Sequence, residues 1–349
     1  MLKPEIATTK PFYKELKRGR TYYWCSCGRS KRQPFCDGSH QGTGFEPVAY
    51  TAQEDNEEVL FCGCKQTGTG PFCDGTHNNL LGGYAEEDPD SPENRRVPIQ
   101  TEKDGPRTVI NGGCYVFSIA DAKMETRGNL RHCLVIGPEF GALHQSQYYA
   151  ELPSGRSPVI AFGERDVILT VVGGHGAVTI SGRDFAVAPT DGVYVRPNEA
   201  FSLQVTGADP LKVFISAGPG GEIGWQDEMP DNFDATQPQR LVKVNPAKRN
   251  AMGKRFFQVL VDKNVGSTMV TQFIGHIPLS KGVPHRHLYE EALIILTGGG
   301  YMWTEDWKAP VKAGDVIFLP RKQIHSLQCT APEGMDVVGV IYPGDNPSI

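Results

Sequence analysis

The chain has 349 residues, enough for two or three domains, and a formal net charge of −5 at pH 7. That charge gives no case for nucleic acid as a partner, and no apolar run approaches the length of a membrane span. The 40 Gly and 26 Pro indicate many turns and favour a mainly β fold. The segment Met1–Glu5 forms no signal-peptide core, so we expect a cytoplasmic protein.

Residues 25–40 and 62–77 contain the same pattern of residues, 37 residues apart. Each copy has two Cys separated by one residue, then Pro-Phe-Cys-Asp-Gly, a small residue and His. The ligand-type residues are Cys25, Cys27, Cys36 and His40 in the first copy and Cys62, Cys64, Cys73 and His77 in the second. Thiolates select zinc, Cu(I) or iron–sulfur clusters, and zinc modules usually place two residues between paired Cys. Two Cys-rich turns without metal are the remaining alternative.

The repeated motif resembles that of the CDGSH iron–sulfur family, the mitoNEET-type proteins, over roughly residues 10–80. It includes that family's Ser or Thr position, at Ser30 and Thr67. The resemblance implies one [2Fe–2S] cluster in each copy, held by its three Cys and its His. Some members pair two chains with one motif each, and this chain resembles those that carry both motifs. A single His ligand implies a cluster that is easier to reduce than an all-Cys cluster and sensitive to pH. We expect Asp37 and Asp74 to shape the turn before the His.

Two charged stretches flank this repeat. Residues 1–50 carry nine Lys and Arg against four acids, which fits docking of an acidic redox partner; a solvated basic surface is the alternative. Residues 81–107 are acidic, contain Pro and show little apolar periodicity. We expect them to form a linker.

From about Thr108 onward, short apolar runs alternate with turn signals, which predicts a sandwich or barrel. The expected strands are 167–172, 177–180, 193–195, 201–205, 257–261, 269–274, 292–296, 316–319 and 337–342. The two halves of this region align with each other. We therefore expect two related barrels, 108–222 and 251–349, joined by a connector at 223–250.

The second half contains a further set of metal-ligand residues. His285 and His287 are two residues apart, so on a strand they face the same side, and Glu291 follows four residues later. His325 lies on another expected strand. Three imidazoles and a carboxylate suit a first-row divalent metal with open coordination positions, although ordinary strand polar residues are the alternative.

This second spacing resembles the two motifs of the cupin superfamily. Gly282 stands closer to the His pair than the family pattern has it, and Arg321 and Lys322 replace the usual Gly after Pro320. The ligand positions themselves are intact. The resemblance implies a jelly-roll barrel with a mononuclear metal site.

The first barrel departs from that pattern. Sequence alignment places Ile160, Phe162 and Ser202 at the positions of the three ligand histidines, and Asp166 at the position of Glu291. One carboxylate without imidazoles holds a transition metal poorly. We expect this barrel to be degenerate and metal-free.

The expected fold class is thus mainly β, with a small tandem CDGSH iron–sulfur domain at 1–80 followed by two cupin (jelly-roll) β-barrels. The expected function is that of an oxidoreductase: a mononuclear non-haem iron oxygenase of a small molecule that uses dioxygen in the second barrel, with two built-in [2Fe–2S] clusters supplying electrons. Iron(II) is the expected ion, and manganese, nickel, copper and zinc accept the same donors. We assign no catalytic residue beyond the metal ligands.

Two other functions remain open. A non-redox metal cupin, such as an isomerase, lyase or hydrolase, uses its ion as a Lewis acid, and the clusters are then structural or regulatory. A non-enzymatic redox or iron sensor is the third. The expected partners are the substrate, dioxygen, an acidic redox protein and a second copy of the chain, with neither nucleic acid nor membrane. Cupins carry many chemistries, so the fold alone does not decide.

Overall fold

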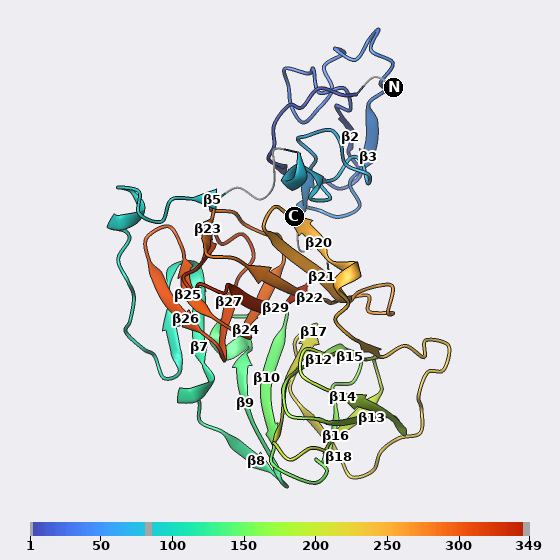
Figure 1. The fold of residues 1–349 in the computed structure, drawn as a ribbon. Coiled ribbons are helices and arrows are strands. Elements are labelled where there is room, and N and C mark those ends of the chain that lie inside the picture. The colour runs from blue at the N-terminus through green and yellow to red at the C-terminus, as the bar shows by residue number, and fades with distance from the viewer. Residues whose placement is uncertain (1–2, 81–85, 345–349) are drawn as a thin grey trace. The chain divides into compact units, whose positions relative to one another are not determined.

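The structure is a computed structural model that describes residues 3–80 and 86–344. The chain divides into two compact units, Met1–Ala85 with Asn346–Ile349, and Glu86–Asp345, and each is described by itself. Strands are the main regular structure of both units, which confirms the mainly β expectation (Figure 1). Helical structure in the described ranges is limited to short 3₁₀ segments. No helix there has the length and apolar character needed to cross a membrane.

The N-terminal unit contains two small antiparallel sheets. β1 (Phe12–Leu16) pairs with β4 (Glu57–Phe61), and β2 (Thr21–Trp24) pairs with β3 (Val48–Thr51). These strands are rich in aromatic and β-branched residues, which fit a pleated, half-buried surface. Trp24 and Phe61 are buried in the core of the unit, and each such side chain contributes about 2–3 kcal/mol on burial. A 3₁₀ segment, η1 (Thr76–Asn79), follows the second copy of the repeat.

The first barrel packs a seven-stranded sheet on a five-stranded sheet. Their strand orders are β19-β15-β12-β17-β10-β9-β8 and β14-β13-β16-β11-β18. The strands are β8 (Glu125–Arg127), β9 (Leu130–Ile136), β10 (Ser146–Leu152), β11 (Val159–Ala161), β12 (Asp166–Gly173), β13 (Gly176–Ile180), β14 (Arg183–Val187), β15 (Gly192–Val195), β16 (Ala200–Val205), β17 (Leu211–Gly218), β18 (Gly224–Gln226) and β19 (Leu241–Val242).

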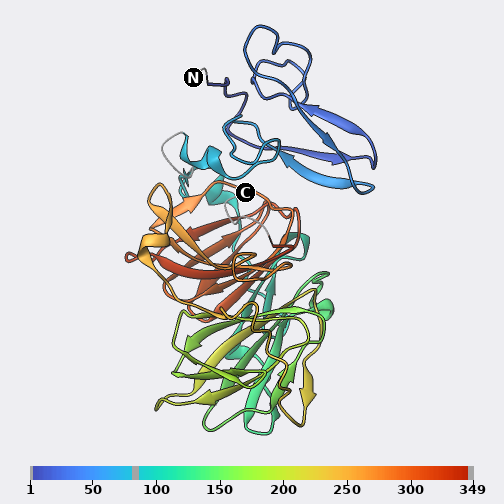
Figure 2. The same ribbon diagram turned by 90° about the vertical axis from the view of Figure 1, so that its right-hand side faces the viewer.

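The second barrel is built in the same way, from an eight-stranded and a five-stranded sheet (Figure 2). Their strand orders are β20-β21-β22-β29-β24-β27-β7-β6 and β26-β25-β28-β23-β5. The strands are β5 (Glu86–Glu87), β6 (Arg107–Val109), β7 (Tyr115–Ser118), β20 (Asn250–Met252), β21 (Arg255–Val261), β22 (Thr271–Ile277), β23 (Ser280–Gly282), β24 (Glu290–Ile295), β25 (Gly299–Trp303), β26 (Lys308–Lys312), β27 (Asp315–Leu319), β28 (Ser326–Cys329) and β29 (Met335–Tyr342). Each of the nine strands expected from the sequence overlaps a strand of one of the two barrels.

The strand pairing crosses the boundaries expected from the sequence. β6 and β7, expected in the first barrel, join the second barrel's sheet through β27, and Figure 1 shows β7 beside that barrel. β5, from the expected linker, pairs with β23. β18 and β19, from the expected connector, pair with β11 and β15 of the first barrel. Strands of two to four residues carry too few positions for a readable period, so only the fold reveals their partners.

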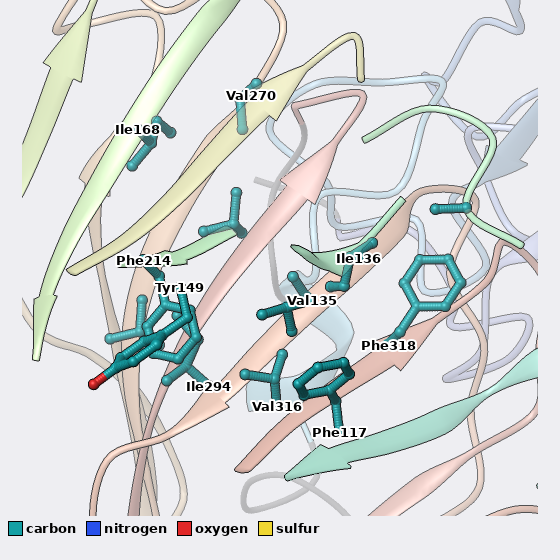
Figure 3. Packing of buried hydrophobic residues seen from close by; sticks show 14 of the residues in the cluster. Phe117, Val135, Ile136, Tyr149, Ile168, Phe214, Val270, Ile294, Val316 and Phe318 are labelled. Carbon is teal, nitrogen blue, oxygen red and sulfur yellow. The ribbon is translucent and has the colours of Figure 1, made fainter. Parts of the chain in front are cut away.

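One hydrophobic cluster joins the two barrels (Figure 3). Tyr149, Ile168 and Phe214 of the first barrel belong to it together with Ile294 and Val316 of the second. Phe117 of β7 belongs to the same cluster. Each barrel also has its own interior cluster. The barrels therefore share a core, so separating them would expose apolar side chains that are now buried.

The registers of the two barrels show which positions correspond. Asp166 pairs with Gly218 at the end of β17, and Glu290 pairs with Tyr342 at the end of β29. Asp166 therefore corresponds to Glu290, and Val167 corresponds to Glu291. The sequence alignment of Asp166 with Glu291 was wrong by one residue, and in a strand one residue moves a side chain to the opposite face.

The position of His325 in the first barrel needs the same correction. Gly176 pairs with Val205 as Gly300 pairs with Cys329, which makes Ser202 the counterpart of Ser326. Phe201 therefore stands where His325 stands, and Phe201 pairs with Ile160 just as His325 pairs with His285.

Candidate metal centres

The two copies of the N-terminal repeat bring their ligand-type atoms together in the same way. Cys25 Sγ lies 3.6 Å from Cys27 Sγ, and Cys36 Sγ lies 3.1 Å from His40 Nδ1. In the second copy the corresponding Cys–Cys and Cys–His separations are 3.4 Å and 3.3 Å. Two thiolates bound to one tetrahedral ion at about 2.3 Å lie roughly 3.7 Å apart. The sulfur pairs thus fit a shared metal ion.

Backbone hydrogen bonds repeat between the copies as well. The amide of Cys25 donates to Pro34 O, and the amide of Cys62 donates to Pro71 O, both at 2.9 Å. In each copy the amide of the third Cys donates to the strand that precedes the first Cys. The amide of Cys36 donates to Tyr23 O, and that of Cys73 donates to Leu60 O, both at 2.8 Å. Each copy is therefore a loop folded back onto the end of a strand.

Asp37 shapes the turn before His40, as expected. Its carboxylate accepts hydrogen bonds from the Ser39 amide at 3.0 Å and the Lys31 amide at 2.8 Å. The Ser39 side chain contributes most to holding the pKa of Asp37 far below its usual range, followed by the amides of Lys31 and Ser39. Asp74 makes the equivalent bonds to Thr76 and Gly68. Asp74 does not cap the 3₁₀ segment after Gly75, which has no side-chain cap.

Burial sets the protonation of the second copy. It raises the pKa of Cys73 to about 12 and lowers the pKa of His77. The neutral imidazole is ready to bind a metal, whereas the thiol must lose its proton to do so. A metal ion supplies the positive charge that stabilises such a buried thiolate. The donor set therefore fits a cationic cluster better than it fits free thiols.

The second barrel brings together His285, His287 and His325, whose ligand atoms lie within 4.8 Å of one another. His285 follows β23 and His325 precedes β28. The two backbones form an isolated β-bridge in which each amide donates to the other residue's carbonyl oxygen at 2.9 Å. This bridge brings into one site two histidines that are far apart in the sequence.

Backbone carbonyl groups fix which imidazole nitrogen faces the site. His285 Nδ1 lies 3.0 Å from Val283 O, and His325 Nδ1 lies 2.8 Å from Gln323 O. Donation through Nδ1–H leaves Nε2 as the basic nitrogen, which is the arrangement typical of metal-binding histidines. The His287 ring stacks on Tyr289 at 4.5 Å between centroids. Glu291 reaches the site through His287, since its Oε2 lies 3.7 Å from His287 Nε2.

Burial also dominates the titration of this site. It raises the pKa of Glu291 to about 7, and it lowers the pKa of His285. The pKa of His325 falls well below its usual value through burial and repulsion by the other two imidazoles. The neutral imidazoles of His285 and His325, beside a carboxyl group that ionises near pH 7, belong to a donor set that one divalent cation satisfies.

The first barrel has carbon side chains at all four corresponding positions. Ile160, Phe162, Val167 and Phe201 are buried and belong to one hydrophobic cluster. Asp166 faces the other barrel instead, where it accepts hydrogen bonds from the amides of the loop at 268–269. No donor of the first barrel therefore stands where the ligands of the second stand.

Three residues of these regions had no recognised signal in the sequence. Glu290 lies beside a predicted ligand but binds the other barrel. Lys65 follows a predicted cysteine ligand and is buried. Arg255 opens β21 and donates to Ser280 Oγ at 3.0 Å. For Lys65 alone the sequence held a difference that could have been noticed, because Gly28 occupies its position in the first copy.

Two family models match parts of the chain. The model described as "Iron-binding zinc finger CDGSH type" matches residues 5–41, and the model described as "Cupin domain" matches residues 277–341. The chain therefore has an N-terminal CDGSH iron-binding domain and a C-terminal cupin domain. The second copy of the repeat lies outside the matched range.

Two curated relatives match the chain over a short length. Both are named "CDGSH iron-sulfur domain-containing protein 3, mitochondrial". The mouse protein is 57% identical over 54 residues, which is 15% of this chain and 39% of that protein. The human protein is 57% identical over 51 residues, covering 14% of this chain and 40% of that protein. The match thus spans about two fifths of each relative.

Solved structures resemble the C-terminal unit in fold. Protein Ylba from E. coli has a TM-score of 0.52 and 16% identity, covering 68% of this chain and 95% of that one. An oxalate decarboxylase from Lactobacillus farciminis, in a formate complex, has a TM-score of 0.52 and 14% identity, covering 71% and 88%. At these identities the likeness shows the cupin fold alone.

Proposed function

We propose that this protein is an oxygen-using oxidoreductase with three metal centres in one chain. His285, His287, Glu291 and His325 hold one iron(II) ion in the second barrel, and each N-terminal copy holds a [2Fe–2S] cluster. The observation that carries the proposal is the contrast between the barrel interiors. Three imidazoles within 4.8 Å of one another occupy positions where the first barrel packs apolar side chains. Packing alone does not require such a polar set.

The two clusters match the electron count of an oxygenase. Insertion of one oxygen atom into a C–H bond follows RH + O₂ + 2e⁻ + 2H⁺ → ROH + H₂O, and each cluster carries one electron. An iron ion held by the ligand residues of the second barrel would supply the redox chemistry with dioxygen.

The presence of the N-terminal repeat and the second barrel in one chain supports electron delivery, because the proposed electron donors and the proposed acceptor are then present in a fixed ratio.

The remaining parts receive structural and docking roles. We assign the first barrel a metal-free, structural role, because it completes the core shared with the second. The exposed cations Lys17, Arg18 and Arg20 fit an acidic electron-carrier protein that reloads the clusters. The cytoplasm is the compartment we assign, because its reducing conditions preserve thiolate ligands.

Anaerobic purification followed by metal analysis and electron paramagnetic resonance tests the proposal. We expect about five iron and four sulfide per chain. His325→Ala should lose one iron and keep both cluster signals, and His175→Ala, outside the site, should lose none. On mixing the reduced protein with O₂, His325→Ala should slow cluster reoxidation at least tenfold. Full activity with zinc in the second barrel would instead support a non-redox metal enzyme.

A further inference from the structure

A cavity opens between the two barrels at one end of their shared interface. β12 and β24, which occupy the same place in the two barrels, begin at Asp166 and Glu290, and there each carboxylate binds a loop of the opposite barrel. Near the other ends of these strands, Val172 of the first barrel and Leu296 of the second line a cavity of about 360 Å³. This volume is typical of sites that bind small molecules.

Both barrels contribute apolar side chains to the walls of this cavity. Phe214 of the first barrel and Ile294 of the second line it, and both belong to the hydrophobic cluster that joins the barrels. The 3₁₀ segment Ile119–Asp121 contributes Ile119. Such side chains offer water no hydrogen-bonding partners, so these walls favour an apolar molecule over ordered water.

Lys212 places a positive charge at the wall of the cavity. Its ammonium group makes no hydrogen bond or ion pair with any residue in the described ranges, and no Asp or Glu of those ranges lines the cavity. Its neighbours across the sheet are Gly173 on β12 and Glu151 on β10. A Cβ added at Gly173 would lie 3.3 Å from Lys212 Cδ, so the lysine stem lies over that glycine. Glu151 instead pairs with Arg131, at 3.8 Å between Oε1 and Nη1.

Tyr149 adds a hydrogen-bond donor to the same cavity. Its ring belongs to the shared cluster, and its hydroxyl group points away from Val135 and Val316 (Figure 3). That hydroxyl group lies 3.5 Å from Glu151 Oε2, which is long for an O–H···O hydrogen bond. Burial raises the pKa of Tyr149, so the hydroxyl group stays neutral and can donate to an anion.

We propose that the cavity between the barrels binds an aliphatic carboxylate of medium chain length. The hydrocarbon chain lies on the apolar walls, and the carboxylate accepts hydrogen bonds from Lys212 and Tyr149. A cation without a partner beside apolar walls fits a molecule with one negative group and an apolar remainder. At about 30 Å³ for each water-sized group, the cavity has room for roughly a dozen non-hydrogen atoms, about as many as octanoate or decanoate has.

This site goes beyond the proposed function and does not depend on it. The residues that line the cavity include none of those assigned to the three metal centres. The site therefore exists whether or not the clusters pass electrons to the second barrel.

Calorimetric titration of the full chain with octanoate, octanol and acetate tests the proposal. We expect octanoate to bind at least tenfold more tightly than octanol, which lacks the charge, and acetate, which lacks the chain, to show no binding. Lys212→Met keeps a stem of similar length; it should weaken octanoate binding at least tenfold and leave octanol binding unchanged. Tyr149→Phe should weaken octanoate binding about fivefold. Lys263→Met, which removes an exposed cation, should change neither affinity.

Two variants that fill the cavity test its location. Leu296→Trp should abolish binding of both octanoate and octanol. Ile119→Trp lies on a different element and serves the same purpose if Leu296→Trp does not fold. His325→Ala, at the metal site of the second barrel, should bind octanoate as tightly as the unaltered chain does.

Three results would overturn the proposal. The first is equal affinity for octanoate and octanol, or unchanged octanoate affinity in Lys212→Met. The second is loss of octanoate binding in His325→Ala, which would place the ligand inside the second barrel. The third is sedimentation of the unaltered chain as a dimer that the cavity-filling variants dissociate, which would show that a second copy of the chain covers the cavity.

Discussion

Asp166 of the first barrel and Glu290 of the second make the same contact in opposite directions. Asp166 Oδ2 accepts hydrogen bonds from the amides of Thr268 and Met269 at 2.9 and 2.8 Å, in the loop before β22. Glu290 accepts from the amides of Leu143 and His144 at 2.7 and 3.0 Å, in the loop before β10. Each barrel thus ties down the loop of the other, and the two interiors are held as one unit.

We expect Asp166→Ala to lower the free energy of unfolding by about 3 kcal/mol, because it removes the charged acceptor of two backbone amides and of the buried Tyr194 hydroxyl group. Glu290→Ala should have an effect of similar size for the same reason. Urea denaturation measures both changes. Asp209→Ala, at an exposed carboxylate, should change stability by less than about 0.5 kcal/mol.

Metal analysis of the same variants distinguishes a structural Asp166 from a ligand. We expect Asp166→Asn to retain every metal ion that the unaltered chain holds. Loss of a mononuclear ion with no loss of stability would contradict the role described here and restore Asp166 as a ligand.

Glu291 should make the stability of the metal-free protein depend on pH. Burial raises its pKa from 4.5 to about 7, so near pH 5 the folded chain holds a proton that the unfolded chain releases. Its stabilising contribution is present below pH 4.5 and is lost as the pH rises through 7. Glu291→Gln should therefore gain about 2 kcal/mol over the unaltered chain between pH 5 and pH 8.

Chelator-treated protein, denatured with urea at both pH values, measures this difference. Glu305→Gln, at an exposed carboxylate, serves as the control and should show no such trend. With metal bound the order should reverse, because the ion holds Glu291 ionised. Equal pH dependence of Glu291→Gln and the unaltered chain would show that Glu291 does not titrate near pH 7.

Two glycines at matching turns of the two barrels should resist substitution. Gly174 and Gly298 both have a φ of 72°, and a Cβ would lie 2.2 Å from Pro210 O and 2.4 Å from Gly334 O respectively. Gly298→Ala should destabilise the protein by about 3 kcal/mol through strain and steric contact together.

Gly314→Ala isolates the strain, because Gly314 has a φ of 91° and open space around its position. It should cost about 1–2 kcal/mol. Thermal unfolding of both variants measures the difference. A loss in Gly298→Ala no larger than that in Gly314→Ala would show that the turn moves to accommodate the methyl group.

Local spacing in the sequence was sufficient to predict much of the fold. The nine apolar runs predicted strands, because burial on a sheet leaves short, β-branched stretches between turns. The pair His285 and His287 predicted a shared face, and His325 was predicted to join them on a separate strand; the structure brings these three together. Such patterns can be recognised in a sequence because the residues concerned are close together in it or belong to a repeated motif.

Long-range register could not be predicted in the same way. The counterpart of Glu291 was placed one residue away, at Asp166, because one extra residue before β12 is invisible without the pairing of β12 with β17. The short strand β5 has too few residues to show the alternation of buried and exposed side chains that is typical of a strand.

Electron transfer from the clusters to the second barrel is the claim on which the proposed function depends most directly. Anaerobic protein with Fe(III) in the second barrel and both clusters chemically reduced allows a test without substrate. Rapid-freeze electron paramagnetic resonance then follows the ferric and the cluster signals. We expect the ferric signal to disappear as the clusters reoxidise, at a rate independent of protein concentration. A ferric signal that persists beside reduced clusters, or a rate proportional to protein concentration, would contradict the account.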